Sequence, residues 1–513
     1  MVGVHRLVSG LVASLASVSL ALTLSTVPAT ATAAGAPDPG LDEASAALTE
    51  ARAALAGRTG RDATMALTSL RLAYPDLTPA DRQAADALLA RPTDGAADPE
   101  QFGYTVPEAT PVCGTHICVH YVPTSPDAPA LTDADANGSP DWVDFTLAEL
   151  ESVLAFEVGT LGYRLPPGDG AQGGSPLFDV YLSQLGDEGL YGFCMPENRA
   201  PGERFAYSSY CVLDNDFGEF PLGPVPSLTV TAAHELFHAI QFGYDAAEDR
   251  WLLEATATWI EERYADSVDD NRQYLGYGQL GRPRTPLDEF EGTGAGQYGN
   301  WLFFELVSQR FGTDAVRRIW EKLDAAGDGP DRFSAEGVRA VVQASGHRSF
   351  ADFYARFATA NQAPRRFYSE GATYRAAPVT RSVTLRPTRR VVRESKRLDH
   401  LTSAAYRFRP SGAVGARWRL RLSVDAPTTP GAAATALVRK RGGGVAVRSI
   451  DLHRDGDRTI TMAFAHRRVV SVTLVLANGS TRFKPCWRGT AYSCQGRPTD
   501  DDAAYSMVAR LAR

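Results

Sequence analysis

Hydrophobic and polar residues follow different periods in successive parts of the chain. Residues 36–98 are rich in alanine and repeat with a helical period. Residues 110–225 mix short strand-like runs with turns, and residues 227–361 return to a helical period. Residues 380–513 alternate as strands do. The pattern therefore predicts an α+β fold that ends in an all-β sandwich.

Individual elements can be placed within these parts. Thr78-Pro79-Ala80-Asp81 is typical of a helix start, with Thr78 as the N-cap and Pro79 at the first helical position. Gly312 stands where a helix ending at Phe311 would place its C′ glycine. We also expect a helix over Trp142–Leu161 and strands over Cys118–Val122, Phe178–Leu182, Tyr207–Leu213, Arg417–Val424, Thr459–Phe464 and Val469–Leu476.

The length of 513 residues is too great for a single compact core, so we expect several domains. Residues 35–100 precede a Pro-, Gly- and Asp-rich stretch and fit either a helical prosegment or an N-terminal subdomain. A central domain over residues 101–377 and the sandwich over residues 378–513 follow. The composition, 44% hydrophobic and 22% charged, excludes wholesale disorder.

The formal charge of −8 hides a division within the chain. Residues 378–513 hold 26 Lys and Arg against nine Asp and Glu, which makes +17, so the other residues carry −25. An acidic body argues against a nucleic-acid binder, and we expect no nucleic-acid partner. The basic sandwich is suited to contact with a cell-wall polymer or an acidic glycan.

The N-terminus and the cysteines both point to export. Residues 1–34 contain an apolar stretch after His5 and Arg6 and then small residues around Ala33, which predicts a signal peptide. The alternative is a single membrane anchor, since the stretch nearly reaches spanning length. We expect a secreted, extracellular protein with no membrane contact after cleavage. Six cysteines fall into three neighbouring pairs, which predicts three local disulfides: Cys113 with Cys118, Cys194 with Cys211, and Cys486 with Cys494.

One motif carries metal chemistry. His234, Glu235 and His238 form an HExxH sequence, in which two histidines one helical turn apart can reach the same metal ion. Glu235 lies beside them and can hold the water that the metal activates. Two solvated histidines on a surface helix are the alternative, but the hydrophobic residues between them predict a buried helix, where His and Glu need partners.

The third ligand should come from a neighbouring element. Glu254 follows within an apolar helical run, where an unpaired carboxylate would be costly and a divalent cation would relieve the cost. The alternative is an ion pair with Arg250 or Arg263. Glu261 lies two turns further along the same helix face and is placed to orient a ligating histidine, or it is a plain surface acid.

HExxH followed by a helix that reads W-x-x-E-x-x-A-x-W-x-E resembles the gluzincin zinc metallopeptidases, and in particular their aminopeptidase-like branch. The resemblance implies a β-sheet subdomain and a helical subdomain around the HExxH helix. The run from Tyr298 to Gly312 looks like that branch's tyrosine-bearing helix, so the resemblance implies that the Tyr298 hydroxyl stabilises the oxyanion. Residues 101–375 as a whole resemble a poorly characterised group of exported bacterial metalloproteases.

The sequence departs from related patterns at several places. Gln241 and Tyr244 exclude the metzincin arrangement, which requires Gly and His there. The connection Phe242–Arg250 is short for a gluzincin and must be tight. The exopeptidase signature is not convincingly present, because Met195-Pro196-Glu197-Asn198 carries an inserted proline. We therefore expect endopeptidase rather than aminopeptidase action.

These residues predict a monomeric, secreted zinc endopeptidase that acts on a protein or peptide substrate. Zinc on His234, His238 and Glu254 would activate water, and Glu235 would act as general base. Two alternatives stay open. The chain could be an exported binding or adhesion protein with a degenerate protease domain, or a metal-dependent hydrolase of non-peptide amides.

A second metal motif lies upstream, where the sequence matches the calcium-loop pattern D-x-D-x-N-G-x-x-D-x-x-D. Oxygen-bearing side chains at alternate positions suit a hard cation, and Gly138 permits the sharp turn. Prolines before the loop exclude the entering helix of an EF-hand, so we expect a lone structural calcium loop; a solvated Asp- and Gly-rich turn is the alternative. The expected calcium ligands are Asp133, Asp135, Asn137, Ser139, Asp141 and Asp144.

Overall fold

A computed structural model of the chain describes residues 39–58, 60–61, 63–94, 103–324, 330–347 and 349–513. The expected signal peptide lies outside these residues. The helices are α1 (Pro39–Leu55), α2 (Thr64–Ala73), α3 (Pro79–Leu88), α4 (Asp141–Leu154), α5 (Pro224–Asp245), α6 (Arg250–Tyr264), α7 (Gly296–Gly299), α8 (Trp301–Phe311), α9 (Asp314–Leu323), α10 (Ser334–Ala344) and α11 (Phe350–Ala360). Short single-turn helices supplement them.

The strands form three sheets, as an α+β fold requires. Their bounds are β1 (Val112–Cys113), β2 (Ile117–His120), β3 (Phe178–Ser183), β4 (Gly192–Arg199), β5 (Tyr207–Asp214), β6 (Arg381–Leu385), β7 (Val391–Leu398), β8 (Thr402–Pro410), β9 (Arg419–Asp425), β10 (Ala432–Lys440), β11 (Val445–Ser449), β12 (Asp457–Ala463), β13 (Val469–Asn478) and β14 (Ala503–Ala512). The expected strands in both halves of the chain are therefore present, with ends shifted by a few residues.

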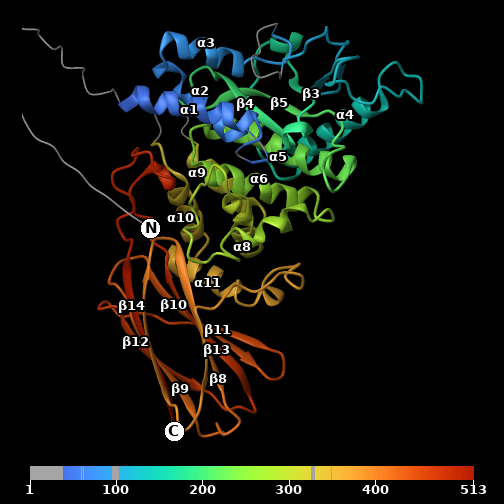
Figure 1. Cartoon of the computed structure of the whole chain (residues 1–513). Coiled ribbons are helices and arrows are strands. Elements are labelled where there is room, and N and C mark those ends of the chain that lie inside the picture. The colour runs from blue at the N-terminus through green and yellow to red at the C-terminus, as the bar shows by residue number, and fades with distance from the viewer. Residues whose placement is uncertain (1–38, 59, 62, 95–102, 325–329, 348) are drawn as a thin grey trace, which may run out of the picture. The chain divides into compact units, whose positions relative to one another are not determined.

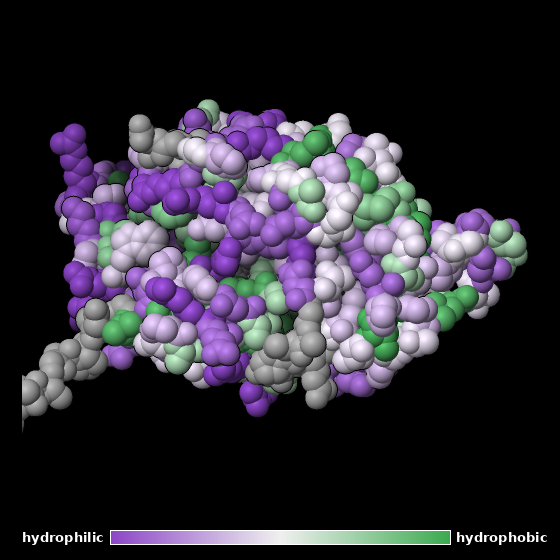
Figure 2. All heavy atoms as spheres, turned by 90° about the horizontal axis from the view of Figure 1, so that it is seen from above, coloured by the Kyte–Doolittle hydropathy of each residue, from purple (hydrophilic) through white to green (hydrophobic). Residues whose placement is uncertain are grey.

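The first sheet has the order β1-β2-β3-β5-β4. Strands β2, β3 and β5 are parallel, whereas β4 runs antiparallel to β5 and forms an edge of the sheet. Helix α5 packs on one face of this sheet, and α1–α3 cover the other face (Figure 1). Seen from above in Figure 2, the surface is mostly polar or intermediate in hydropathy, with smaller hydrophobic areas between.

Local sequence signals account for several helix ends. The Thr78 hydroxyl accepts a hydrogen bond from the Asp81 amide at 3.1 Å, as the N-cap prediction requires. Helix α8 ends at Phe311, and Gly312 has a φ of 95°, a conformation that favours glycine. The expected helix from Tyr298 to Gly312 is interrupted, because Asn300 separates α7 from α8.

Helix α4 begins one residue before the expected start and is followed by a π-helical turn. It runs from Asp141 to Leu154 and continues as a π-helical turn over Ala155–Thr160. The predicted span to Leu161 is thus covered by two kinds of helix. Over so few residues, the spacing of hydrophobic side chains does not distinguish an α-helix from a π-helix.

The C-terminal region is a β-sandwich. A five-stranded sheet of order β11-β10-β13-β8-β6 faces a four-stranded sheet of order β12-β9-β14-β7 across a separate hydrophobic core. Strand β9 alternates as predicted, with Leu420, Leu422 and Val424 buried and arginines 419 and 421 exposed. The alternation expected from the sequence is confirmed.

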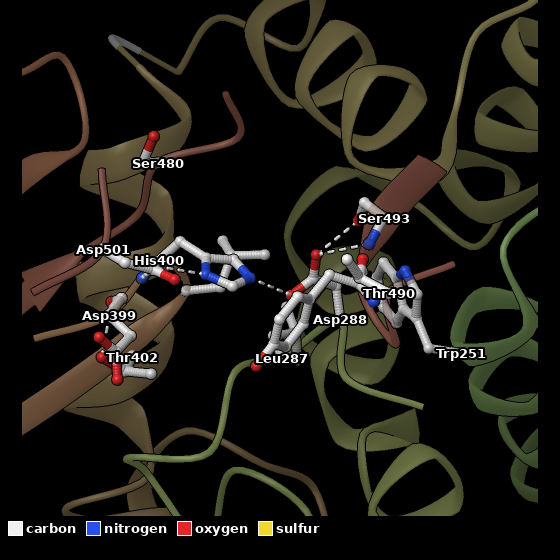
Figure 3. Close-up of polar contacts among 12 residues, drawn as sticks. Trp251, Leu287, Asp288, Asp399, His400, Thr402, Ser480, Thr490, Ser493 and Asp501 are labelled. Carbon is white, nitrogen blue, oxygen red and sulfur yellow. Dashed lines mark hydrogen bonds and ion pairs between the residues drawn. The ribbon is translucent and has the colours of Figure 1, made fainter. Parts of the chain in front are cut away.

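A buried polar cluster joins the sandwich to the helical region (Figure 3). His400 lies between two carboxylates, with Nε2 at 3.0 Å from Asp288 and Nδ1 at 2.6 Å from Asp501. The Ser493 hydroxyl donates to the other oxygen of Asp288 at 2.6 Å. The Leu287 amide also donates to the Leu401 carbonyl at 3.2 Å, so side chains and backbone both cross this junction.

The three predicted disulfides are present. Cys113 bonds Cys118, Cys194 bonds Cys211, and Cys486 bonds Cys494. These bonds fit a protein of an oxidising compartment, secreted or periplasmic. Within the described part of the chain, none of the helices combines the length and the apolar character needed to cross a bilayer.

Candidate metal centre

Two consecutive helices bring the candidate ligands together. His234 and His238 lie on α5 and Glu254 lies on α6, and one ligand atom from each comes within 4.8 Å of the others. The Glu254 carboxylate is 3.3 Å from His234 Nε2 and 3.9 Å from His238 Nε2. All three side chains are buried. The structure thus places the three residues singled out in the sequence around one point.

The turn between α5 and α6 makes this convergence possible. Helix α5 extends to Asp245 and α6 begins at Arg250, so only four residues connect them. The tightness expected for Phe242–Arg250 is real, and part of the expected loop is helical. At its end, Asp249 accepts hydrogen bonds from the Ser334 hydroxyl and, at 2.7 Å, from the Cys494 amide of the C-terminal disulfide loop. The turn is therefore held from outside the two helices.

Hydrogen bonds determine which nitrogen of each histidine faces the centre. His234 Nδ1 lies 2.7 Å from Glu261, and a carboxylate only accepts, so Nδ1 carries the proton. His238 Nδ1 lies 2.7 Å from the side-chain oxygen of Gln241, whose amide nitrogen donates to Leu253 and Thr256. The other nitrogen of each ring, Nε2, therefore faces Glu254, and in a neutral imidazole this is the nitrogen that can ligate a metal ion.

The structure tests one interpretation of Glu254, the ion pair with Arg250 or Arg263. Arg250 pairs with Glu50 at 2.8 Å, and Arg263 pairs with Glu305 at 3.3 Å. The arginine-pairing alternative is therefore wrong. The proposed orienting position of Glu261 agrees with its contact to His234, and this carboxylate is buried rather than on the surface.

The donor set fits a zinc-type ion. Two imidazole nitrogens and a carboxylate are the ligands that catalytic zinc sites use, with a further position left for water or substrate. Calcium and magnesium prefer sites made of oxygen alone. All three side chains are buried, and a cation of any kind among them would be stabilised in this low-dielectric interior.

Glu235 and Tyr298 lie beside this centre. Glu235 is buried on α5, and its carboxylate accepts a hydrogen bond from the Thr64 hydroxyl at 3.2 Å. The Tyr298 ring centroid is 6.1 Å from that of His234 and 5.3 Å from that of Tyr274. Both predicted residues are thus near the ligands, although α7, which carries Tyr298, is only four residues long.

Sequence reasoning missed four residues of this site. In the sequence, Gln241 was used only to exclude the metzincin pattern, but in the structure its side chain orients His238. A polar residue one turn after the motif, on a helix predicted to be buried, could have indicated this role. Arg61 and Thr64 come from the N-terminal region, and Tyr274 follows α6. Nothing in the local sequence links these three to the motif, since only the tertiary fold brings them there.

The candidate calcium residues lie in the loop before α4 and in the first turn of α4. Oxygens of Asp133, Asp135 and Asp141 lie within 4.8 Å of one another. The other three are bonded to each other, since Asp144 accepts from the Asn137 amide at 2.8 Å and from the Ser139 hydroxyl at 2.7 Å. Gly138 has a φ of 94°, as the expected turn requires. No helix enters this loop, because residues 121–130 are not helical.

The near-match to an exopeptidase signature lies on the edge strand β4. Glu197, within that stretch, pairs with Arg91 at 2.6 Å, and Arg91 also contacts Asp169 and Asp179. Met195 packs against the N-terminal helices. In this structure the stretch therefore serves the packing of residues 39–94 on the sheet.

Comparisons with known proteins add little to this geometry. No family model matches the sequence, and no curated protein does. Among solved structures, the chain is similar to a periplasmic inhibitor of g-type lysozyme, PliG, from Aeromonas hydrophila, with 12% identity and a TM-score of 0.15. The match covers 26% of this chain and 96% of the inhibitor.

Proposed function

We propose that the protein is a secreted, zinc-dependent endopeptidase of the gluzincin type. The observation that carries the proposal is the convergence of His234, His238 and Glu254 with Glu235 beside them. The oriented tautomers of both histidines support it, because a metal site needs lone pairs on the facing nitrogens. Three disulfides and the sequence of residues 1–34 support secretion.

Each residue then has a separate task. The two histidines and Glu254 hold the ion, which when bound supplies the Lewis acidity that lowers the pKa of a water molecule. Glu235 accepts the proton of the attacking water and returns it to the leaving amine. Tyr298 donates a hydrogen bond to the developing oxyanion. Glu261 and Gln241 keep the imidazole rings in the ligating orientation.

The test compares two glutamates of neighbouring helices. Glu235→Gln should lower casein hydrolysis by roughly 10²–10⁴-fold, since general-base catalysis contributes that much, while zinc content stays at one per chain by mass spectrometry. Glu262→Gln is the matched control. Burial raises the pKa of Glu262 to about 8, so glutamine resembles its neutral form and hydrolysis should persist.

The outcomes separate the alternatives. Stoichiometric zinc without casein cleavage, but with Glu235-dependent hydrolysis of a small acyl amide, would identify a hydrolase of non-peptide amides. A chain that binds no zinc would leave only the binding-protein alternative. Undiminished turnover in Glu235→Gln would refute the assigned role of this carboxylate.

For the upstream loop we propose structural calcium on Asp133, Asp135 and Asp141, with Asn137, Ser139 and Asp144 completing the site. The ion would hold the entrance to α4, since Asp141 begins that helix. Calcium should raise the thermal unfolding temperature, and Asp135→Asn should abolish the increase. An equal increase in the variant would exclude the loop as the site.

A second function, binding of an acidic glycan by the sandwich region, is favoured by one groove. A cavity of about 450 Å³ is lined by Arg365, Arg366, Arg439 and Lys440, with no acidic residue among the described residues that line it. Burial lowers the pKa of Arg439, which is typical of a cation without a facing carboxylate. Polygalacturonate should bind at low salt, and Arg439→Gln should weaken binding; equal binding of a neutral glucan would contradict the assignment.

A further inference from the structure

The N-terminal region reaches into the candidate active site through the connection between α1 and α2. The Thr64 hydroxyl, at the first residue of α2, donates to Glu235 at 3.2 Å. The same hydroxyl accepts from the Cys194 amide of strand β4 at 3.0 Å. Thr64 is fully buried. One side chain of the N-terminal region therefore contacts the general base that we propose.

The backbone of this connection also pairs with the chain at the start of the edge strand. The Tyr191 amide donates to the Arg61 carbonyl at 2.9 Å, one residue before β4 begins. Strand β4 pairs with β5 on one side only, and an extended peptide commonly binds a sheet through such an edge. Arg61 and Thr64 thus make contacts that a peptide substrate would make beside Glu235.

The Arg61 side chain occupies a site built for a cation. Its guanidinium lies 4.7 Å from the Tyr191 ring centroid and 5.5 Å from that of Tyr274, and it donates to the Tyr274 hydroxyl at 2.6 Å. It also lies 3.1 Å from Asp270 and 3.8 Å from Glu261. Burial acts to lower the pKa of Arg61, but Tyr274 and the two carboxylates outweigh it and hold the pKa above its usual range.

The helices on either side of the connection are firmly packed. Leu48, Leu67 and Leu70 belong to a hydrophobic cluster that includes Phe193 and Tyr210 of the sheet. Loss of α1–α3 would expose that sheet face to water, which is unfavourable for an apolar surface. The helices therefore cover the sheet, and among the described residues Arg61 before α2 and Thr64 at its start contact the candidate active site.

Resting on the function proposed above, we propose that Arg61 and Thr64 together act as a built-in inhibitor that occupies the substrate position, and that the site around Arg61 selects an arginine side chain in the substrate. Displacement of Arg61 and Thr64 from these contacts opens the site, while the packed parts of α1–α3 remain on the sheet. Asp270 and Tyr274 then bind the guanidinium of a substrate as they bind that of Arg61.

The inhibitory contact is tested in the full chain. Arg61→Ala should raise the rate of cleavage of a quenched-fluorescence peptide with a central arginine by about tenfold or more, because the apparent affinity of a site scales with its open fraction. Arg58→Ala is the matched control, since Arg58 is exposed and belongs to the same connection. An intact wild-type chain as active as Arg61→Ala would overturn the proposal of inhibition.

The selectivity is tested in the Arg61→Ala background. Peptides with a central arginine should be cleaved about tenfold faster than those with alanine, the size expected for a charged hydrogen bond. Adding Asp270→Asn should remove this preference, because the arginine peptide loses the carboxylate that faces its guanidinium. Equal rates on both peptides before that change would overturn the selectivity.

A binding measurement makes the proposal independent of catalysis. In the Glu235→Gln background, a fluorescent arginine-containing peptide should bind about tenfold more tightly to the chain that also carries Arg61→Ala. If binding improves but none of the chains with Glu235 cleaves peptides, the segment occupies a peptide site and the proposed function is wrong. If binding is unchanged while Glu235-dependent cleavage occurs, the function stands and the inhibitor is refuted.

Discussion

Two buried sites in this molecule combine histidine with carboxylates, but they differ in how the histidine nitrogens are bonded. At the candidate metal centre, His234 and His238 each bond an acceptor through Nδ1 and direct Nε2 toward Glu254. At the junction with the sandwich, His400 bonds carboxylates through both nitrogens (Figure 3). In the first arrangement two rings share one carboxylate through Nε2, and in the second a single ring lies between two carboxylates.

From this difference we infer that hydrogen-bond partners, as well as residue type, determine whether a buried histidine is suited to a metal ion. The His400 imidazole has a carboxylate within 3.0 Å of each nitrogen, so it carries both protons and is a cation itself. Burial acts to lower the pKa of His400, but Asp288 and Asp501 outweigh it and raise the pKa to about 10. The junction is thus an internal ion cluster, whereas in the proposed function the candidate metal centre takes its cation from solution.

The largest expected effect separates the two sites by metal content. His238→Ala should lose stoichiometric zinc and with it all hydrolysis, because two protein ligands do not make a catalytic zinc site. His400→Gln should keep one zinc per chain, which elemental mass spectrometry of the dialysed protein will show. Loss of zinc in His400→Gln alone would reverse the assignment.

Next in size is the cost to stability at the junction. His400→Gln leaves Asp288 buried without its cation, so the free energy of unfolding by urea should fall by about 3–5 kcal/mol. His453→Gln in the sandwich, at an exposed histidine, is the control and should change little. A His400 variant as stable as the wild type would show that the cluster contributes no net stability.

A smaller effect concerns the residue that orients His234. Glu261→Gln keeps an acceptor but removes its charge, so zinc affinity should fall by roughly 10–100-fold in a competition with a chelator. Glu262→Gln, on the same helix, faces Asn271 and should leave the affinity unchanged. Equal affinities in both variants would mean that Glu261 serves packing only.

The smallest effect is the pH dependence of the junction. The pKa of His400 is raised in the folded state from 6.5 to about 10, so its stabilisation is complete below pH 6.5 and is lost as pH rises toward 10. Between pH 6.5 and 8 the loss should be roughly 1–2 kcal/mol. His400→Gln should show a flatter pH profile of unfolding; an identical slope would place the titrating group elsewhere.

The same cluster also sets an acid limit. Burial acts to raise the pKa of Asp288, but His400 outweighs it and holds the pKa below 3.8; Asp501 is shifted in the same direction. Groups with lowered pKa values stabilise the fold above their unfolded value and lose that contribution as pH falls. The junction is therefore most stable between about pH 4 and pH 6.5.

Much of the site could be predicted because its information is local. The HExxH spacing places two histidines on one helix face. The next helix carries Glu254 in an apolar run, where a bound cation would offset the free energy of burying a carboxylate. The three disulfides join cysteines close in sequence, and strict alternation marked β9. Each of these signals depends on a period or a spacing within about 20 residues.

What could not be predicted depends on contacts between distant segments. Thr64 lies 171 residues from Glu235, and His400 lies 112 residues from Asp288. No sequence period reports such pairs, because their positions follow from how α2 enters the sheet edge and how the sandwich meets the helices. The break at Asn300 was also missed, since helical hydrophobic spacing continues across it.

By itself, the sequence determined the chemistry available to this protein: two histidines and glutamates at metal-binding spacing, an acidic body, a basic sandwich and three local disulfides. Only the tertiary structure decided how that chemistry is used. It directs His234 and His238 toward Glu254 and pairs both nitrogens of His400 with carboxylates. It also brings Arg61 and Thr64 to the candidate active site. The physical reason is that the partner and direction of a hydrogen bond depend on how side chains pack in three dimensions. The spacing of residues along a helix, in contrast, follows from their order in the sequence.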